Sequence, residues 1–277
     1  MDGGGEGTIK ILLLSDTPTG ICYDDQTEVL TRNGWRYFFE TDMQDEFATI
    51  DTQGVIEYQK PEKMTVEPYD GKLYSLASDT VDAVVTPGHK LYVKRGACTH
   101  CTGSRWRRDF ELVAAEDLIG KPKRFKKDGV WVGVCQEFFE LPAVTVQSNS
   151  QLMFAPRLIP MDDWLSFLGH YIAEGSATYH QCYTVQVRQS RARHLDLMKV
   201  AMQKVTPFHA WNNEERVLVR DRQLFSYLKD NVGESHGKHD RRIPREFMEL
   251  CPEQLRILWE AISLGDGSMN GKTEIIS

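Results

Sequence analysis

Apolar residues follow a helical period in two stretches, one past the middle of the chain and one near its end. In the first stretch, Trp164–Ser176, Leu165, Leu168 and Ile172 recur at steps of three and four residues. This spacing places them on one face of a helix. Leu255, Leu258 and Ile262 follow the same spacing in the second stretch, so we expect a second amphipathic helix there.

Both stretches carry small residues four positions apart, followed by an acid and a glycine. These residues are Gly169, Ala173, Glu174 and Gly175 in the first stretch and Ala261, Gly265, Asp266 and Gly267 in the second. A strip of small side chains lets two helices approach closely, and a glycine commonly ends a helix. If the helices pair, Glu174 and Asp266 emerge side by side. Adjacent carboxylates repel unless a cation lies between them, and oxygen ligands suit Mg²⁺. The alternative is two unrelated amphipathic helices.

The pattern between Cys22 and Val134 is different, because short apolar runs alternate with turn signals, as in an all-β domain. Asn33-Gly34 predicts a two-residue hairpin turn. Strands are predicted at Thr27–Arg32, Trp35–Phe39, Val55–Gln59, Lys72–Ala77, Ala83–Thr86, Lys90–Val93 and Val130–Val134, with a helical turn at Val113–Leu118.

After an expected linker at Ala155–Pro160, the pattern alternates between helices and strands. We expect Asp162 or Asp163 to cap the first helix. The further elements are a strand at Tyr179–Gln189, a helix at Arg191–Val205, a strand at Val217–Val219 and a helix at Gln223–Leu228. The predicted fold is therefore mixed, with an all-β part followed by an α+β part.

Composition narrows the function classes. The net charge of −7 argues against nucleic-acid affinity over the whole surface, although basic residues cluster at Lys90–Arg108 and Lys121–Lys127. Six cysteines and no leader or membrane span predict a cytoplasmic protein with free thiols. Cys98 and Cys101 form a lone C-x-x-C, which is either a zinc site lacking two ligands or a loop with free thiols.

The two helical stretches resemble a known signature. F-L-G-H-Y-I-A-E-G and W-E-A-I-S-L-G-D-G are similar to the nine-residue motif of the LAGLIDADG homing endonucleases, with Glu174 and Asp266 at the acidic position. The resemblance implies an αββαββα half of such a nuclease over 156–277. It also implies cleavage of double-stranded DNA with Mg²⁺ held by the two acids.

The resemblance suggests further DNA contacts. The polar face of the strand after the first helix carries Gln186 and Arg188, which suit base edges in the major groove. The segment around Ile243-Pro244 resembles the family's Lys-x-Ile-Pro, with Arg241 in place of the lysine and Lys238 nearby. A basic group there could steady a phosphate, but an arginine cannot act as a base. A half-exposed strand and a charged loop are the alternatives.

Two motifs in the β-rich part resemble inteins of the Hint type. C-Y-D-D-Q-T-E-V-L-T-R-N-G-W, from Cys22, is similar to their opening block, and T-P-G-H is similar to the second block, with Gly88 where asparagine is frequent. The resemblance makes Cys22 the nucleophile, His89 the proton donor and Thr86 an orienting hydrogen-bond partner. Histidine titrates near neutrality and suits that role, and splicing needs no cofactor.

The order of modules predicts an intein with an inserted nuclease. Residues 1–21 are then the start of a host protein, 22–155 the splicing domain and 156–277 an incomplete nuclease. The C-terminal intein and extein segment, with its His-Asn junction, would be missing, so the chain is a fragment, a truncation or a split intein. The competing interpretations are a free-standing homing endonuclease with a vestigial splicing domain and a non-catalytic DNA-binding protein of the same fold.

Overall fold

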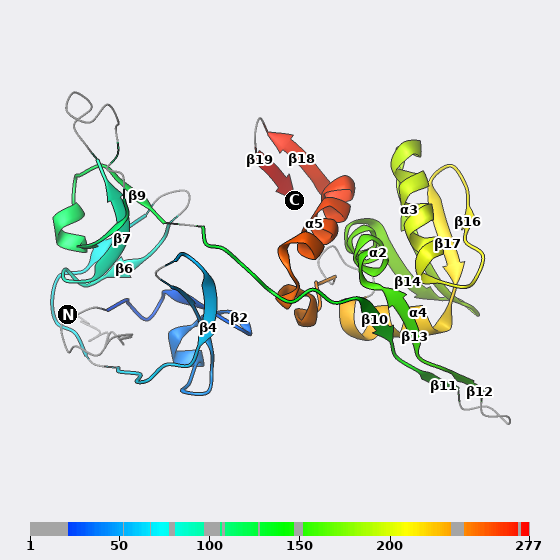
Figure 1. Cartoon of the computed structure of the whole chain (residues 1–277), viewed down its shortest axis with the longest axis horizontal. Helices are drawn as coiled ribbons and strands as arrows, with labels where there is room; N and C mark the ends of the chain where they lie inside the picture. The colour runs from blue at the N-terminus through cyan, green and yellow to red at the C-terminus, as the bar shows by residue number, and fades with distance from the viewer. Residues whose placement is uncertain are drawn as a thin grey trace, which may run out of the picture. The chain divides into compact units, whose positions relative to one another are not determined.

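The chain divides into two compact units, Met1–Trp131 and Val132–Ser277, called here the N-terminal unit and the C-terminal unit (Figure 1). The computed structural model describes residues 22–51, 53–66, 68–77, 81–96, 106, 109–126, 128–146, 152–233, 241–270 and 273–276. The expected host segment 1–21, Cys98, Cys101 and Lys238 lie outside these residues.

The N-terminal unit is built from short antiparallel strands, as the alternating pattern predicts. One sheet has the order β2-β1-β3-β4 and another the order β8-β7-β9, while β5 pairs with β6. The strands are β1 (Glu28–Thr31), β2 (Gly34–Tyr37), β3 (Phe47–Ile50), β4 (Ile56–Gln59), β5 (Tyr74–Ser75), β6 (Val84–Val85), β7 (Lys90–Arg95), β8 (Glu111–Ala114) and β9 (Lys123–Phe125). The predicted hairpin is confirmed: Thr31 pairs with Gly34, whose φ of 102° favours glycine.

The helical turn predicted at Val113–Leu118 is confirmed as a 3-10 turn at Ala115–Leu118, while Val113 and Ala114 end strand β8. One prediction for this unit needs correction. Val130–Val134 forms only isolated bridges, and the side chains of Val130, Val132 and Val134 are all more than half exposed. Apolar alternation there does not produce a strand, because the two ends bridge to different units, Val130 to Val55 and Val134 to Leu250.

The C-terminal unit is α+β, which confirms the mixed fold class. Its helices are α2 (Met161–Glu174), α3 (Ala192–Val205), α4 (Arg222–Tyr227) and α5 (Pro252–Asp266), with a π-helical turn at Leu228–Val232 and 3-10 turns at Phe38–Glu40 in the first unit and Arg245–Glu249 here. Its strands are β10 (Phe138–Leu141), β11 (Val144–Val146), β12 (Leu152–Phe154), β13 (Arg157–Pro160), β14 (Gly175–Tyr179), β15 (Tyr183–Arg188), β16 (Trp211–Asn212), β17 (Arg216–Arg220), β18 (Gly267–Asn270) and β19 (Thr273–Ile276).

A four-stranded sheet of order β14-β15-β17-β16 and the helices α2 and α3 enclose the core of this unit (Figure 1). The single strand expected at Tyr179–Gln189 is instead the second arm of a hairpin, because Gln181, at φ 63°, turns the chain between β14 and β15. Helix α2 begins earlier than the expected cap at Asp162 or Asp163. Pro160 takes the N-cap position, so Asp162 and Asp163 lie inside the first turn.

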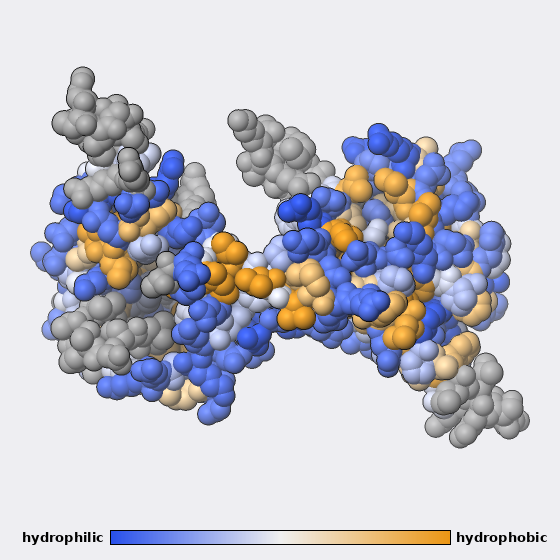
Figure 2. Space-filling view, in the orientation of Figure 1, coloured by the Kyte–Doolittle hydropathy of each residue, from blue (hydrophilic) through white to orange (hydrophobic). Residues whose placement is uncertain are grey.

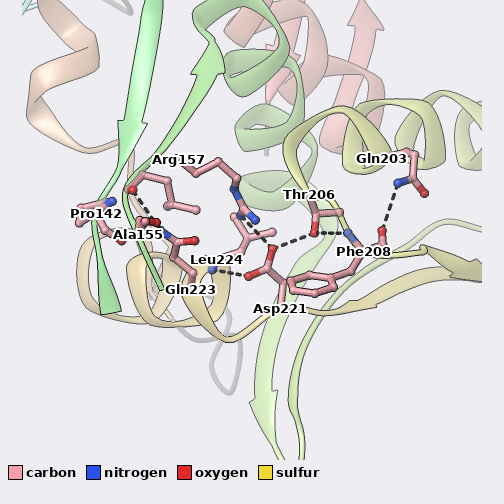
Figure 3. Close-up of polar contacts among 10 residues, drawn as sticks. Pro142, Ala155, Arg157, Gln203, Thr206, Phe208, Asp221, Gln223 and Leu224 are labelled. Carbon is pink, nitrogen blue, oxygen red and sulfur yellow. Dashed lines mark hydrogen bonds and ion pairs between the residues drawn. The ribbon is translucent and has the colours of Figure 1, made fainter. Parts of the chain in front are cut away.

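The units divide before the boundary expected at 155/156. β10 pairs with β13 and β11 pairs with β12, so the segment expected as a linker is a strand with Ile159 buried. Gln223 joins this ribbon to α4, since its Nε2 donates to the carbonyls of Pro142 at 2.8 Å and Ala155 at 2.9 Å (Figure 3). These long-range pairings assign residues 132–155 to the C-terminal unit.

A buried carboxylate ties the ribbon to the helices. Asp221 is 1% exposed, and its Oδ2 accepts from Arg157 and from the hydroxyl of Thr206, both at 2.8 Å (Figure 3). Its Oδ1 accepts from the backbone N–H of Leu224 at 3.0 Å and so caps α4. Both oxygens of this buried carboxylate therefore have hydrogen-bond partners.

The expectation of free thiols is wrong for one pair of cysteines. Cys135 and Cys251 form a disulfide, with their Cα atoms 4.9 Å apart. The sequence alone does not indicate this pairing, because 116 residues separate the two cysteines. Backbone hydrogen bonds between Val134 and the Glu249–Cys251 segment bring them together. Cys182 and Cys22 remain thiols.

The visible surface of both units is mainly hydrophilic (Figure 2). Within the residues that the structure describes, no helix has the length and hydrophobicity that a bilayer crossing needs.

Candidate functional site

The first candidate centre lies at Cys22, in the N-terminal unit. The thiol of Cys22 is buried, with 6% of the residue exposed. Its backbone N–H donates to Oγ1 of Thr86 at 3.1 Å, and its carbonyl accepts from the N–H of Thr86 at 3.0 Å. Asp24 continues the pairing by donating to Val84. Thr86 therefore contacts the amide nitrogen of the peptide bond between Ile21 and Cys22.

His89 belongs to the same centre. Its backbone N–H donates to the carbonyl of Thr86 at 3.1 Å, in a turn that closes the T-P-G-H motif. Its ring packs edge-on against Tyr23, with centroids 4.3 Å apart. The imidazole is 5% exposed, and among the described residues its Nδ1 has no hydrogen-bond partner. The motif thus places a buried imidazole one turn from Thr86.

The protonation of His89 differs from the expectation. Burial lowers the pKa of His89 from its usual 6.5 to about 4. The imidazole is therefore neutral at pH 7, whereas a histidine with the ordinary pKa would be about one quarter protonated. It can donate a proton to another group only after accepting one.

The second candidate centre is the pair of helices α2 and α5. A Cβ atom built on Gly169 would lie 2.5 Å from Cβ of Ala261, and one built on Gly265 would lie 2.4 Å from Cβ of Ala173. These contacts join 169 to 261 and 173 to 265, so the helices run parallel. They touch through their smallest residues, as expected, and no larger side chain fits between them at these positions.

Because the helices are parallel, both end at the same side of the unit. α2 ends at Glu174 and α5 at Asp266, each followed by a glycine that begins a strand. Cγ of Glu174 would be 3.1 Å from a Cβ on Gly265, the residue before Asp266. The backbones that carry the two acids are therefore neighbours, while the side chain of Asp266 lies outside those described.

A pocket of about 360 Å³ opens beside Glu174. Four residues singled out in the sequence line it: Glu174, Gln186, Arg188 and Arg241. Ser176 and Thr178 on β14 line it as well, and Nε2 of Gln186 donates to Oγ of Ser176 at 2.9 Å. Sequence reasoning missed this pair because it did not recognise β14. The alternation of Ser176 and Thr178 with buried Ala177 was the available signal.

Arg241 caps the carboxyl end of α2. Its guanidinium donates to the carbonyls of Ala173 at 2.9 Å and Tyr171 at 3.3 Å, and also to the carbonyl of Gly175. A cation is favourable at this end of a helix. Arg241 therefore holds the last turn of α2, which carries Glu174, and it also lines the pocket.

Comparison with known proteins gives no family, since no family model matches the chain. The chain is 28% identical over 262 residues to an ATP-dependent Clp protease proteolytic subunit of Chlamydomonas moewusii, covering 88% of this chain and 25% of that protein. It is also 28% identical over 286 aligned positions to a DNA-directed RNA polymerase subunit beta C-terminal section of Stigeoclonium helveticum. That alignment covers 96% of this chain and 25% of that protein.

The chain spans about a quarter of the length of the curated relatives it matches. A protease subunit and a polymerase subunit have different named functions, yet one stretch of sequence is similar to both. This distribution suggests a mobile element inserted into different host proteins.

Proposed function

We propose that this chain is part of an intein-like element that joins an autocatalytic acyl-shift centre at Cys22 to a metal-dependent DNA endonuclease centre at Glu174 and Asp266. The parallel pairing of α2 and α5 through Gly169 and Gly265 carries the proposal, because it sets two acids at one end of the helix pair. The similarity to two different host proteins supports the inserted character of the element.

In the acyl shift, Sγ of Cys22 attacks the carbonyl carbon of Ile21. The C–S bond forms as the C–N bond breaks, and the proton lost by the thiol ends on the amine nitrogen of Cys22, so the step is an isomerisation. Neutral His89 can accept the thiol proton and return it to the nitrogen. Thr86 already holds that nitrogen through its hydroxyl at 3.1 Å.

In the endonuclease centre, Glu174 and Asp266 would hold Mg²⁺, which when bound stabilises negative charge on a phosphate. Carboxylate oxygens are the donors that this ion prefers, and adjacent acids are stabilised by a cation. Gln186 and Arg188 on the pocket wall supply an amide and a guanidinium for base edges of double-stranded DNA. Arg241 keeps the last turn of α2 in place.

The acyl shift is tested by incubating the full chain with a strong thiol and following its mass. We expect release of the segment that ends at Ile21, and Cys22→Ala should abolish it. Cys182→Ala is the matched control and should release the segment normally. A folded wild-type chain that releases nothing would contradict the splicing half of the proposal.

The metal centre is tested by Mg²⁺ titration in a calorimeter. Glu174→Gln and Asp266→Asn should each weaken binding at least tenfold, whereas Glu140→Gln, an exposed acid on β10 of the same unit, should leave it unchanged. If both site variants bind Mg²⁺ as well as the wild type does, the nuclease part of the proposal is wrong. A DNA-binding protein without catalysis would then be favoured.

A further inference from the structure

One pocket of the N-terminal unit is lined mainly by basic side chains, and Cys22, Thr86 and His89 are not among its lining residues. It has a volume of about 890 Å³. Five of its lining side chains are basic and one is acidic, although the whole chain carries a net charge of −7. The basic residues are Lys94 on β7, Lys121, Lys123 and Arg124 around β9, and Lys126 just after it.

Strand pairing places two of these cations against each other. In the antiparallel register of β7 and β9, Lys94 lies directly opposite Arg124. Residues opposite each other point to the same face of a sheet, and like charges in that arrangement are destabilising. A bound anion would remove this repulsion.

Aromatic rings hold the cations in the pocket. The ammonium of Lys94 lies 4.8 Å from the ring centroid of Phe110, and that of Lys126 lies 5.6 Å from the same ring. The guanidinium of Arg124 lies 5.2 Å from the ring of Trp106. These contacts orient the side chains without neutralising their charge.

Acidic partners neutralise only part of the basic surface. Arg95, the neighbour of Lys94, forms a bidentate pair with Glu111 at 2.6 and 2.9 Å, and Lys126 pairs with Asp128 at 2.9 Å. Across the described part of the chain, no salt bridge involves Lys94, Lys121 or Arg124. Lys94 and Arg124, which share one face of this sheet, therefore carry positive charge that no acidic side chain among the described residues neutralises.

We propose that this pocket binds the phosphate backbone of duplex DNA, so that the N-terminal unit contributes a second, sequence-independent contact to the element's DNA. The choice of DNA rests on the proposed endonuclease function. A row of cations spread over two strands suits a polyanion better than a single phosphate ion. The rings already hold cations over their faces, so backbone contact fits better than base stacking.

The test is a fluorescence anisotropy titration of the full chain with a short labelled duplex of arbitrary sequence. The double variant Lys94→Gln/Arg124→Gln should weaken binding at least about tenfold. The negative slope of the log of the association constant against log salt concentration should become shallower by about 2. Lys121→Gln, a single change at an exposed turn, should weaken binding less. Lys63→Gln/Lys72→Gln is the charge-matched control in the same unit and should change little.

The other outcomes separate this proposal from the endonuclease proposal. If Lys94→Gln/Arg124→Gln binds as the wild type does while Arg188→Gln weakens binding, the pocket proposal is wrong and the endonuclease proposal stands. If the control loses as much affinity as the pocket variant, the affinity depends on the total charge of the protein and the pocket proposal is also wrong. Displacement of the duplex by millimolar inorganic phosphate would reassign the pocket to a small anion.

Discussion

The two units hold their candidate chemical groups by different means. In the N-terminal unit, backbone hydrogen bonds between distant segments fix Cys22 against Thr86, over a small aliphatic core that includes Val85 and Val93. In the C-terminal unit, close packing of small residues fixes Glu174, over a larger core rich in aromatic side chains such as Trp164 and Phe139.

The difference shows which changes each centre tolerates. A centre fixed by packing is sensitive to any added volume at the contact, because interiors are close-packed. A centre fixed by hydrogen bonds is sensitive to loss of a partner and to protonation, because a buried polar group has lost its contact with water and needs a partner in its place. Perturbations chosen for one unit should therefore leave the other nearly unchanged.

The largest expected effect is loss of the Cys135–Cys251 disulfide. Cys135→Ser should lower the free energy of unfolding of the C-terminal unit by about 4 kcal/mol, because the bridge closes a long loop in the unfolded chain. Hydrogen exchange read by mass spectrometry should show faster exchange in peptides of α2 and α5. Peptides of β6 and β7 should be unaffected, and equal acceleration there would contradict the independence of the units.

The second effect is overpacking between α2 and α5. Gly169→Ala places a Cβ 2.5 Å from Cβ of Ala261 and 2.7 Å from the carbonyl oxygen of Leu258, so we expect a loss of about 3 kcal/mol in denaturant titration. Adding Ala261→Gly should restore part of this, because it removes the first contact and leaves the second. A neutral Gly169→Ala would mean that the helices separate easily.

The third effect is the pH dependence set by His89. Its folded pKa of about 4 lies below the unfolded 6.5, so its contribution to stability is complete above pH 6.5 and is lost as pH falls toward 4. At pH 5 the loss is about 2 kcal/mol. Hydrogen exchange of β6 and β7 peptides should accelerate accordingly, and His89→Gln should remove that acceleration.

His170 makes this experiment a comparison between units. Burial also lowers its pKa to about 4, in spite of a hydrogen bond with the backbone of Ala261. Peptides of α2 should therefore respond to the same pH range, and His170→Gln should flatten only their response. If one variant flattened both responses, the two units would unfold together.

The smallest effect concerns Thr86. Thr86→Val removes the acceptor of the Cys22 N–H and should cost about 1 kcal/mol, because it leaves that donor buried without its partner. Thr86→Ser keeps the hydroxyl and is the matched control. In the thiol assay, Thr86→Val should slow release of the first segment, whereas Thr86→Ser should release it at nearly the wild-type rate.

Local sequence patterns predicted the turns and helices that depend on residues close together in the sequence. Asn33-Gly34 marks a real hairpin, and the helical period with its small residues marks α2, α5 and the positions of their contact. Both helices end before the glycines that the pattern indicated, Gly175 and Gly267. In these cases the residues that decide the conformation are neighbours in the sequence.

Several misses share one physical cause, because they depend on partners far away in the chain. The ribbon of β10 and β13, the disulfide and the Arg241 cap all join segments whose proximity only the folded chain creates. The low pKa of His89 depends on its burial, which no local motif encodes. Sequence could name these residues, but only the fold could assign their surroundings.

The disulfide also has a consequence for how the first centre can be assayed. A thiol strong enough to intercept a thioester at position 22 also reduces Cys135–Cys251, so the reagent that reports on one unit loosens the other. Hydroxylamine cleaves thioesters and leaves disulfides intact. Used in parallel, the two nucleophiles separate thioester cleavage at Cys22 from the effect of disulfide reduction on the α2–α5 pair.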